Sequence, residues 1–178
     1  YKSSYSYDDY DDYYYDDEYE YDSDSSYVGI SRFILVTDMY MIAKENNNNQ
    51  YVMNADRMSM QNADFRNTIW TGCYSQMTLM CIPVCSDIGL EIHEDTDQII
   101  RIEQGFGMVQ MGECRDDMDY QRRVCRGDII FVPSGMWHNV VNIGRIPMRV
   151  STVYAPPHHP AGTVHKTKKD AQMEYNED

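Results

Sequence analysis

Four side chains in the middle of the chain have the types and spacing to hold a transition metal together. Glu91 and His93 are two residues apart, Gln98 follows, and His138 lies in a later apolar run. Residues two apart on a strand face the same side, so Glu91 and His93 would point together. Two imidazoles, one carboxylate and one amide oxygen suit Zn, Fe, Mn, Co or Ni. Such a set leaves positions open for water or substrate, and Glu91 would serve there as ligand or base.

His138 follows a tight turn between two strand-forming runs. The stretch 127–142 reads GDIIFVPSGMWHNVVN, and its apolar run Ile129–Val132 is β-branched or aromatic throughout, which favours a strand. Pro133 ends that run because proline lacks the N–H that a sheet ladder needs. A second strand is expected over 136–141. A lone histidine here would also fit a buried or rim position with no metal.

This stretch resembles the second motif of the cupin family at every fixed position. Those positions are Gly127, Pro133, Gly135, His138 and Asn142. The resemblance covers residues 65–165. It implies an all-β fold, a cupin double-stranded β-helix (jelly-roll) barrel, with one mononuclear divalent transition metal in its mouth.

The family's upstream first motif is recognisable but altered at three points. With Gly105 as its last glycine, Gln98 stands where glutamate is usual. Glu91-Ile92-His93 replaces His-x-His, and Cys85 occupies the first glycine position. The set Glu91, His93, Gln98 and His138 resembles the mixed ligands of the phosphomannose isomerase branch. A barrel whose polar mouth is a relic without metal is the alternative.

The strand pattern favours an all-β barrel independently of the family. Short runs bounded by glycine or proline turns recur from residue 68 onward. A hairpin is expected about Gln104-Gly105, because glycine suits such a turn. The expected strands cover 68–73, 76–82, 89–93, 97–103, 107–111, 129–132, 136–141 and 147–154. Residues 121–125 lead into the second motif.

The chain divides into four regions by composition. Residues 1–27 form a low-complexity Tyr/Asp arm, and 28–64 form an extension with a strand over 32–37 and a helix over 39–45. Residues 50–67 are expected to be mostly loop, with room for one helical turn. Residues 65–165 form the barrel, and 166–178 are a charged tail expected to fray. His158 and His159 lie in a proline-stiffened segment expected to be an exposed strap.

Charge is concentrated at the start of the chain. The formal net charge is −14, of which −9 falls in residues 1–24 and −5 in the remainder. A mildly acidic body disfavours binding to nucleic-acid phosphate, and no run reaches the length of a membrane span. Five cysteines are present. Two local disulfides are considered, Cys81 with Cys85 and Cys114 with Cys125, and the alternative is that the cysteines are reduced.

Two functions from different classes follow. The first is a metal-binding cupin acting on a sugar phosphate or another small oxygenated molecule. Arg101 is the main basic residue of the apparent pocket, which disfavours a phosphate. The second is a self-assembling subunit of a spore coat, surface layer or extracellular fibre, a homo-oligomer or polymer whose Tyr/Asp arm docks on neighbours. Whether the site is catalytic, and whether the location is cytoplasmic or the spore or cell surface, stay open.

Overall fold

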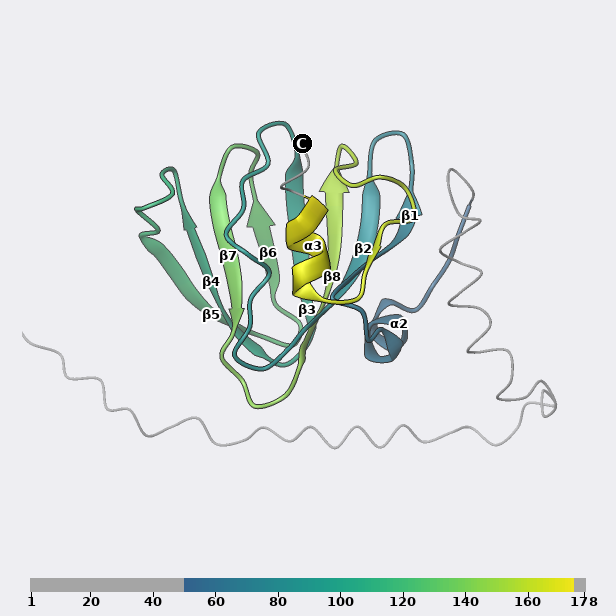
Figure 1. The fold of residues 1–178 in the computed structure, drawn as a ribbon, viewed down its shortest axis with the longest axis horizontal. Helices are drawn as coiled ribbons and strands as arrows, with labels where there is room; N and C mark the ends of the chain where they lie inside the picture. The colour runs from purple at the N-terminus through teal and green to yellow at the C-terminus, as the bar shows by residue number, and fades with distance from the viewer. Residues whose placement is uncertain (1–49, 175–178) are drawn as a thin grey trace, which may run out of the picture. The chain divides into compact units, whose positions relative to one another are not determined.

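The computed structural model describes residues 50–174, all within one compact unit of the chain (Figure 1). The arm expected over 1–27 and the elements expected over 32–37 and 39–45 lie outside the described residues. Nine strands and two short helices make up the described part. In chain order they are α2 (Ala55–Gln61), β1 (Arg66–Thr71), β2 (Gln76–Ile82), β3 (Asp97–Gln104), β4 (Phe106–Gly112), β5 (Tyr120–Cys125), β6 (Ile129–Val132), β7 (Trp137–Asn142), β8 (Met148–Ala155), β9 (Val164–His165) and α3 (Lys168–Glu174).

The strands form two antiparallel sheets, which confirms the all-β prediction. One has six strands in the order β6-β3-β8-β2-β1-β9, and the other has three in the order β5-β4-β7. The late strand β8 is inserted between β3 and β2 and pairs with both. Side chains alternate strictly between buried and exposed along β6, and between buried and half-buried along β7, so each sheet turns one face to the core. The main core cluster includes Ile82, Ile100, Ile102, Val140, Met148 and Val150.

The hairpin expected about Gln104-Gly105 is not formed. Strand β3 pairs with β6 and β8, whereas β4 pairs with β5 and β7. The chain therefore crosses from one sheet to the other at this point. Gly105 has a φ of 96°, and a Cβ there would lie 2.9 Å from the Met148 Cα. Glycine is needed for this close crossing, and the same residue is what a hairpin turn would use.

Helix α2 lies in the stretch expected to be mostly loop with one helical turn, and helix α3 lies in the expected frayed tail. Helix α2 begins after Asn54, whose Oδ1 accepts a hydrogen bond from the Arg57 N–H at 2.8 Å. Its Met58 packs with Ile69 and Leu79 in a second apolar cluster. Helix α3 forms where the tail was expected to fray, because Ala171 is only 3% exposed and joins the main core. Neither helix in residues 50–174 is long and apolar enough to cross a membrane.

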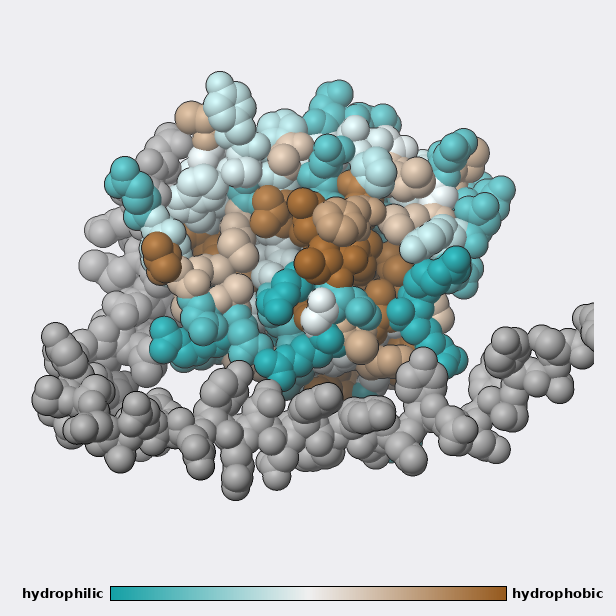
Figure 2. All heavy atoms as spheres, turned by 180° about the vertical axis from the view of Figure 1, so that it is seen from behind, coloured by the Kyte–Doolittle hydropathy of each residue, from teal (hydrophilic) through white to brown (hydrophobic). Residues whose placement is uncertain are grey.

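The outward faces of β3 and β6 carry apolar side chains. Ile99, Ile129 and Phe131 are 41%, 49% and 66% exposed, and Ile99 pairs with Phe131 across the two strands. Figure 2 shows apolar residues gathered near the middle of the face seen from behind. This face departs from the polar exterior that a half-solvated antiparallel sheet usually shows.

The local disulfides considered from the sequence are not formed. Cys81, Cys85, Cys114 and Cys125 are all free thiols. Three of these four residues are exposed, so they do not act as the small buried hydrophobes that the reduced alternative implied.

Candidate metal centre

Glu91 and His93 lie on an extended segment between β2 and β3, not on the strand expected over 89–93. Isolated bridges tie this segment to β7, including one between Glu91 and His138. The Glu91 N–H donates to the His138 carbonyl at 3.0 Å, and the His138 N–H donates to the Glu91 carbonyl at 3.0 Å. The Gly135 N–H donates to the His93 carbonyl at 2.8 Å. Backbone bonds to β7 and its preceding turn therefore set the positions of Glu91 and His93 against His138.

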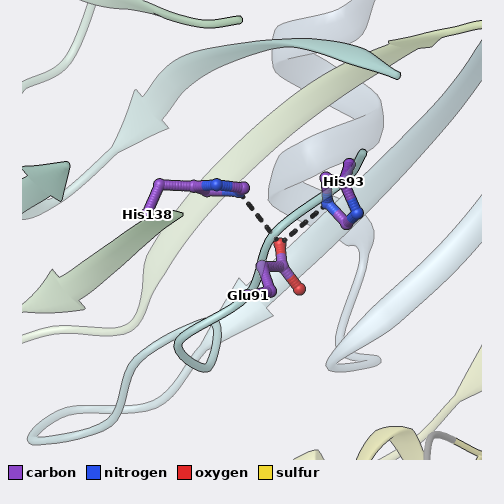
Figure 3. Close-up of side chains that lie close together, drawn as sticks. All are labelled: Glu91, His93 and His138. Carbon is purple, nitrogen blue, oxygen red and sulfur yellow. Dashed lines mark ion pairs between the residues drawn. The ribbon is translucent and has the colours of Figure 1, made fainter. Parts of the chain in front are cut away.

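These three side chains converge on one point inside the fold. The Oε1 atom of Glu91 lies 3.4 Å from Nε2 of His93 and 3.4 Å from Nε2 of His138. Their possible ligand atoms all lie within 4.8 Å of one another. Figure 3 shows the Glu91 carboxylate between the two imidazole rings. The structure thus brings together three of the four residues that the sequence analysis selected.

His138 is held by a hydrogen bond on the side of its ring that faces away from Glu91. The residue is fully buried, and its Nδ1 lies 2.9 Å from the Met136 carbonyl oxygen. A carbonyl only accepts, so Nδ1 donates the proton in this pair, and Nε2 is the ring nitrogen that faces Glu91. A backbone carbonyl that fixes one ring nitrogen in this way is a common support for a metal-binding histidine.

Glu91 is held in its ionised form. Burial by itself would raise the pKa of Glu91, but His138, His93 and the Arg66 guanidinium outweigh it and hold that pKa well below its usual range. Arg66 is itself buried, and its terminal nitrogen lies 3.6 Å from Glu91 Oε2. A carboxylate so strongly held as an anion suits a metal ligand better than a base, since a weak proton acceptor makes a poor general base.

Gln98 is buried on β3 and contacts Tyr154. Its Nε2 donates to the Tyr154 hydroxyl oxygen at 3.2 Å. Its Oε1 is buried and has no hydrogen-bond partner among the described residues. The Tyr154 ring in turn lies 5.6 Å from the His93 ring, centroid to centroid. The amide oxygen therefore has no hydrogen-bond partner among residues 50–174 that would compete with a cation.

The segment after β8 packs on the site and is not the exposed strap expected from the sequence. We call residues 156–160 the strap. The His158 ring centre lies 4.0 Å from that of His93, and His159 is buried with its ring edge-on to Tyr154. Burial first, and the nearby charge of His93 second, lower the pKa of His158 to about 4.

The strap is held by one buried side chain from β2. The Gln76 amide nitrogen donates to the His159 carbonyl at 2.7 Å and to the Thr71 hydroxyl at 3.0 Å. Its amide oxygen accepts from the N–H of His159 at 2.9 Å and of His158 at 3.3 Å. Gln76 thus supplies the strap backbone with hydrogen bonds that a neighbouring strand would otherwise provide.

Arg66 and His158 are the site residues that the sequence analysis missed. Arg66 stands at the start of a β run, and nothing in its local pattern distinguishes it from a surface arginine. His158 did carry a signal, because prolines precede and follow the His158-His159 pair. What the local sequence does not encode is that Gln76, far away in the chain, binds this segment.

The donor set fits a divalent transition metal. Glu91 Oε1, His93 Nε2, His138 Nε2 and Gln98 Oε1 are all buried and make no hydrogen bond to any residue from 50 to 174. Buried polar atoms of this kind are rare and call for a partner. A cation bound by Glu91 Oε1 and the two Nε2 atoms would satisfy three of these atoms. Two imidazole nitrogens and a carboxylate oxygen match borderline metals rather than Ca²⁺ or Mg²⁺.

Comparisons with known proteins agree with this reading of the fold. Residues 78–154 match the family model described as Cupin domain. YrkC of Bacillus subtilis, described as an uncharacterized protein, is 47% identical over 134 residues, which are 75% of this chain and 72% of YrkC. L612 of Acanthamoeba polyphaga mimivirus is 33% identical over 120 residues, 67% of this chain and 73% of L612.

A solved structure matches over most of the described part. The crystal structure of BH2720 from Bacillus halodurans is similar with a TM-score of 0.70 and 46% identity, covering 70% of this chain and 95% of that one. TT1209 from Thermus thermophilus is similar in fold alone, with a TM-score of 0.52 at 18% identity. These matches confirm the double-stranded β-helix barrel that the two motifs implied.

Proposed function

This chain belongs to the cupin superfamily, and on that premise we propose that it binds one divalent transition metal and acts on a small oxygenated molecule. Glu91, His93 and His138 supply the ligands, and the Gln98 amide oxygen is the candidate fourth. The observation that carries the proposal is the buried Glu91 Oε1, which lies 3.4 Å from both imidazole Nε2 atoms.

The chain's own residues prepare this centre for a cation. The Met136 carbonyl accepts a hydrogen bond from Nδ1 of His138, so Nε2 is the nitrogen that faces the centre and can coordinate a cation. Arg66 helps to keep Glu91 ionised. A metal held there would supply a Lewis acid for a carbonyl or hydroxyl oxygen of a bound molecule. An isomerase-like reaction on a sugar phosphate is one such chemistry, proposed here from the resemblance of the ligand set to the phosphomannose isomerase branch.

Metal analysis of the purified full chain tests the proposal. We expect one equivalent of Zn, Fe, Mn, Co or Ni per chain, and we expect His138→Ala to abolish it, because losing one ligand greatly weakens a mononuclear site. His165→Ala is the matched control, since His165 is a buried histidine on β9 outside the cluster. Unchanged metal content in His138→Ala would refute the site.

The assembly role stays a prediction of its own. It depends on residues 1–27, which lie outside the described residues. Deleting residues 1–24 and comparing the two chains by sizing and electron microscopy tests it. If the truncated chain forms the same species as the full chain, the arm has no role in assembly.

A further inference from the structure

A cavity of about 710 Å³ lies between helix α3 and the segment that carries Glu91. Its walls come from the start of β1, residues 88–92, the loop between β4 and β5, the start of β7 and helix α3. The volume falls in the range of small-molecule sites in proteins. Glu91 lines this cavity while its Oε1 faces the two imidazoles, so the cavity borders the candidate metal centre.

Cationic side chains from three separate elements line the cavity. They are Arg66 from β1, Arg115 from the loop after β4 and Lys168 from α3. Glu91 is the carboxylate on the wall, and Asp87 pairs with Lys168 at 2.8 Å. Counting these side chains alone, three cations stand against two carboxylates, a surplus of one positive charge in a chain whose net charge is −14. Arg101, expected from the sequence to be the main basic residue of the pocket, pairs with Glu103 and does not line this cavity.

The rest of the cavity wall is apolar. Phe65, Ile88 and Ala171 are buried side chains that line it. The Arg115 guanidinium carbon lies 5.6 Å from the centre of the Trp137 ring, and both residues belong to the wall. A guanidinium packed over an aromatic ring keeps its N–H groups available in the plane, where they can pair with two oxygens at once.

We propose that this cavity binds a small carboxylate with one negative charge and an apolar body. A surplus of one positive charge matches one carboxylate, and Arg115 offers the planar fork that carboxylates pair with. The apolar walls receive the body of the molecule. That this carboxylate is the substrate of the metal centre rests on the proposed function, whereas its binding in the cavity does not.

Matched acid and amide probes test the charge requirement on the full chain. Phenylacetate and phenylacetamide share a body and differ in charge, and both are titrated by calorimetry and ligand-observed NMR. We expect the acid to bind about tenfold more tightly than the amide, because a charge-assisted hydrogen bond is lost with the charge. Acetate, which lacks the apolar body, is expected to bind more weakly than phenylacetate.

Variants locate the binding. Arg115→Gln is expected to remove most of the acid preference, and Lys168→Gln is the second variant, each checked for folding by its melting temperature. Arg126→Gln is the control, because Arg126 pairs with Asp56 at the surface and is outside the cavity. The proposal is overturned if neither acid binds, if acid and amide bind equally, or if Arg115→Gln and Arg126→Gln behave alike.

Two further readouts separate the alternatives. Inorganic phosphate that competes as well as phenylacetate would overturn the carboxylate assignment in favour of oxyanions in general, as a sugar phosphate would require. Metal content is measured on the same samples. Acid binding without metal loading would leave this inference standing while the proposed function fails, and metal loading without acid binding would do the reverse.

Discussion

The imidazole of His158 lies with its ring centre 4.0 Å from that of His93. This contact has a specific role because the two clustered histidines are held differently. His138 is fixed by its hydrogen bond to the Met136 carbonyl, whereas neither ring nitrogen of His93 makes a hydrogen bond to any residue in the range 50–174. The orientation of His93 therefore depends on the rings of His158 and Tyr154 that pack against it.

Removing the His158 ring should loosen the metal centre. With Zn²⁺ as the probe metal, we expect His158→Ala to lower the affinity about tenfold, in line with the loss of a supporting residue. His158→Phe keeps an aromatic ring without a ligand atom and should stay close to wild type. Competition titration with a chromophoric chelator measures both. Equal losses in the two variants would show that His158 acts through its nitrogen and not through packing.

Gln98 should contribute to metal binding through its amide oxygen. Gln98→Met keeps the volume and removes the oxygen, and we expect it to weaken Zn²⁺ binding about tenfold. The absorption bands of the Co²⁺-loaded chain should shift as well, since they report the ligand set. Gln110→Met on β4 is the control. An unshifted spectrum in Gln98→Met would exclude Gln98 as a ligand.

The free energy of unfolding should decrease as the pH is lowered through the titration range of histidine in the unfolded chain. Burial first, and Arg66 second, lower the pKa of His159 from 6.5 to about 2. The folded chain keeps this ring neutral while the unfolded chain takes up a proton below pH 6.5, so the contribution is complete above 6.5 and is lost as pH falls. Between pH 7 and pH 5 this costs about 2 kcal/mol.

Urea unfolding at the two pH values measures this effect. His158, whose pKa is also lowered, acts in the same direction. His159→Phe keeps a ring against Tyr154 and removes the titrating group, and His159 Nε2 has no hydrogen-bond partner among residues 50–174 that the change would break. Between pH 7 and pH 5, the free energy of unfolding of the variant should therefore decrease by about 2 kcal/mol less than that of the wild type. An identical pH dependence in the variant would contradict the assignment to His159.

The Gln76 side chain should contribute strongly to the free energy of unfolding, because it binds the strap as well as its own strand. Gln76→Leu strands the backbone N–H and C=O of His159, and each buried unsatisfied group costs about 1–3 kcal/mol. We expect a loss of about 2–4 kcal/mol in the free energy of unfolding, together with weaker metal binding because the strap loosens. Gln121→Leu, on the exposed strand β5, is the control. A Gln76→Leu variant as stable as this control would show that the strap is held elsewhere.

The part of the site that could be predicted from the sequence is the part encoded by local spacing. The run 127–142 contains two strand-forming segments around a proline and glycine turn, and it forms β6, the turn and β7 with His138 pointing inward. Glu91 and His93 are two residues apart, and an extended backbone places both on one side even though no regular strand forms there.

The remainder depends on contacts between distant segments. The pattern about Gly105 fits a hairpin and a crossing between sheets equally well, and only the pairing of β8 with β3 decides between them. Arg66 becomes part of the site because β1 passes beside residues 88–92. The strap packs inward because of Gln76, 83 residues before His159. Local periodicity contains no information about such pairings.

The insertion of β8 between β2 and β3 has a consequence for the chain as it leaves the ribosome. Residues 76–82 and 97–104 are synthesised well before 148–155, yet each needs that later segment as its neighbour. Until it arrives, β2 and β3 each present an open hydrogen-bonding edge, which is the template on which nascent chains aggregate. The second motif ends at Asn142, just before β8, so a nascent chain displays its complete set of metal donors while its largest sheet is still split. Mutations in β8 should therefore lower the expression yield more than their effect on the stability of the folded protein would indicate.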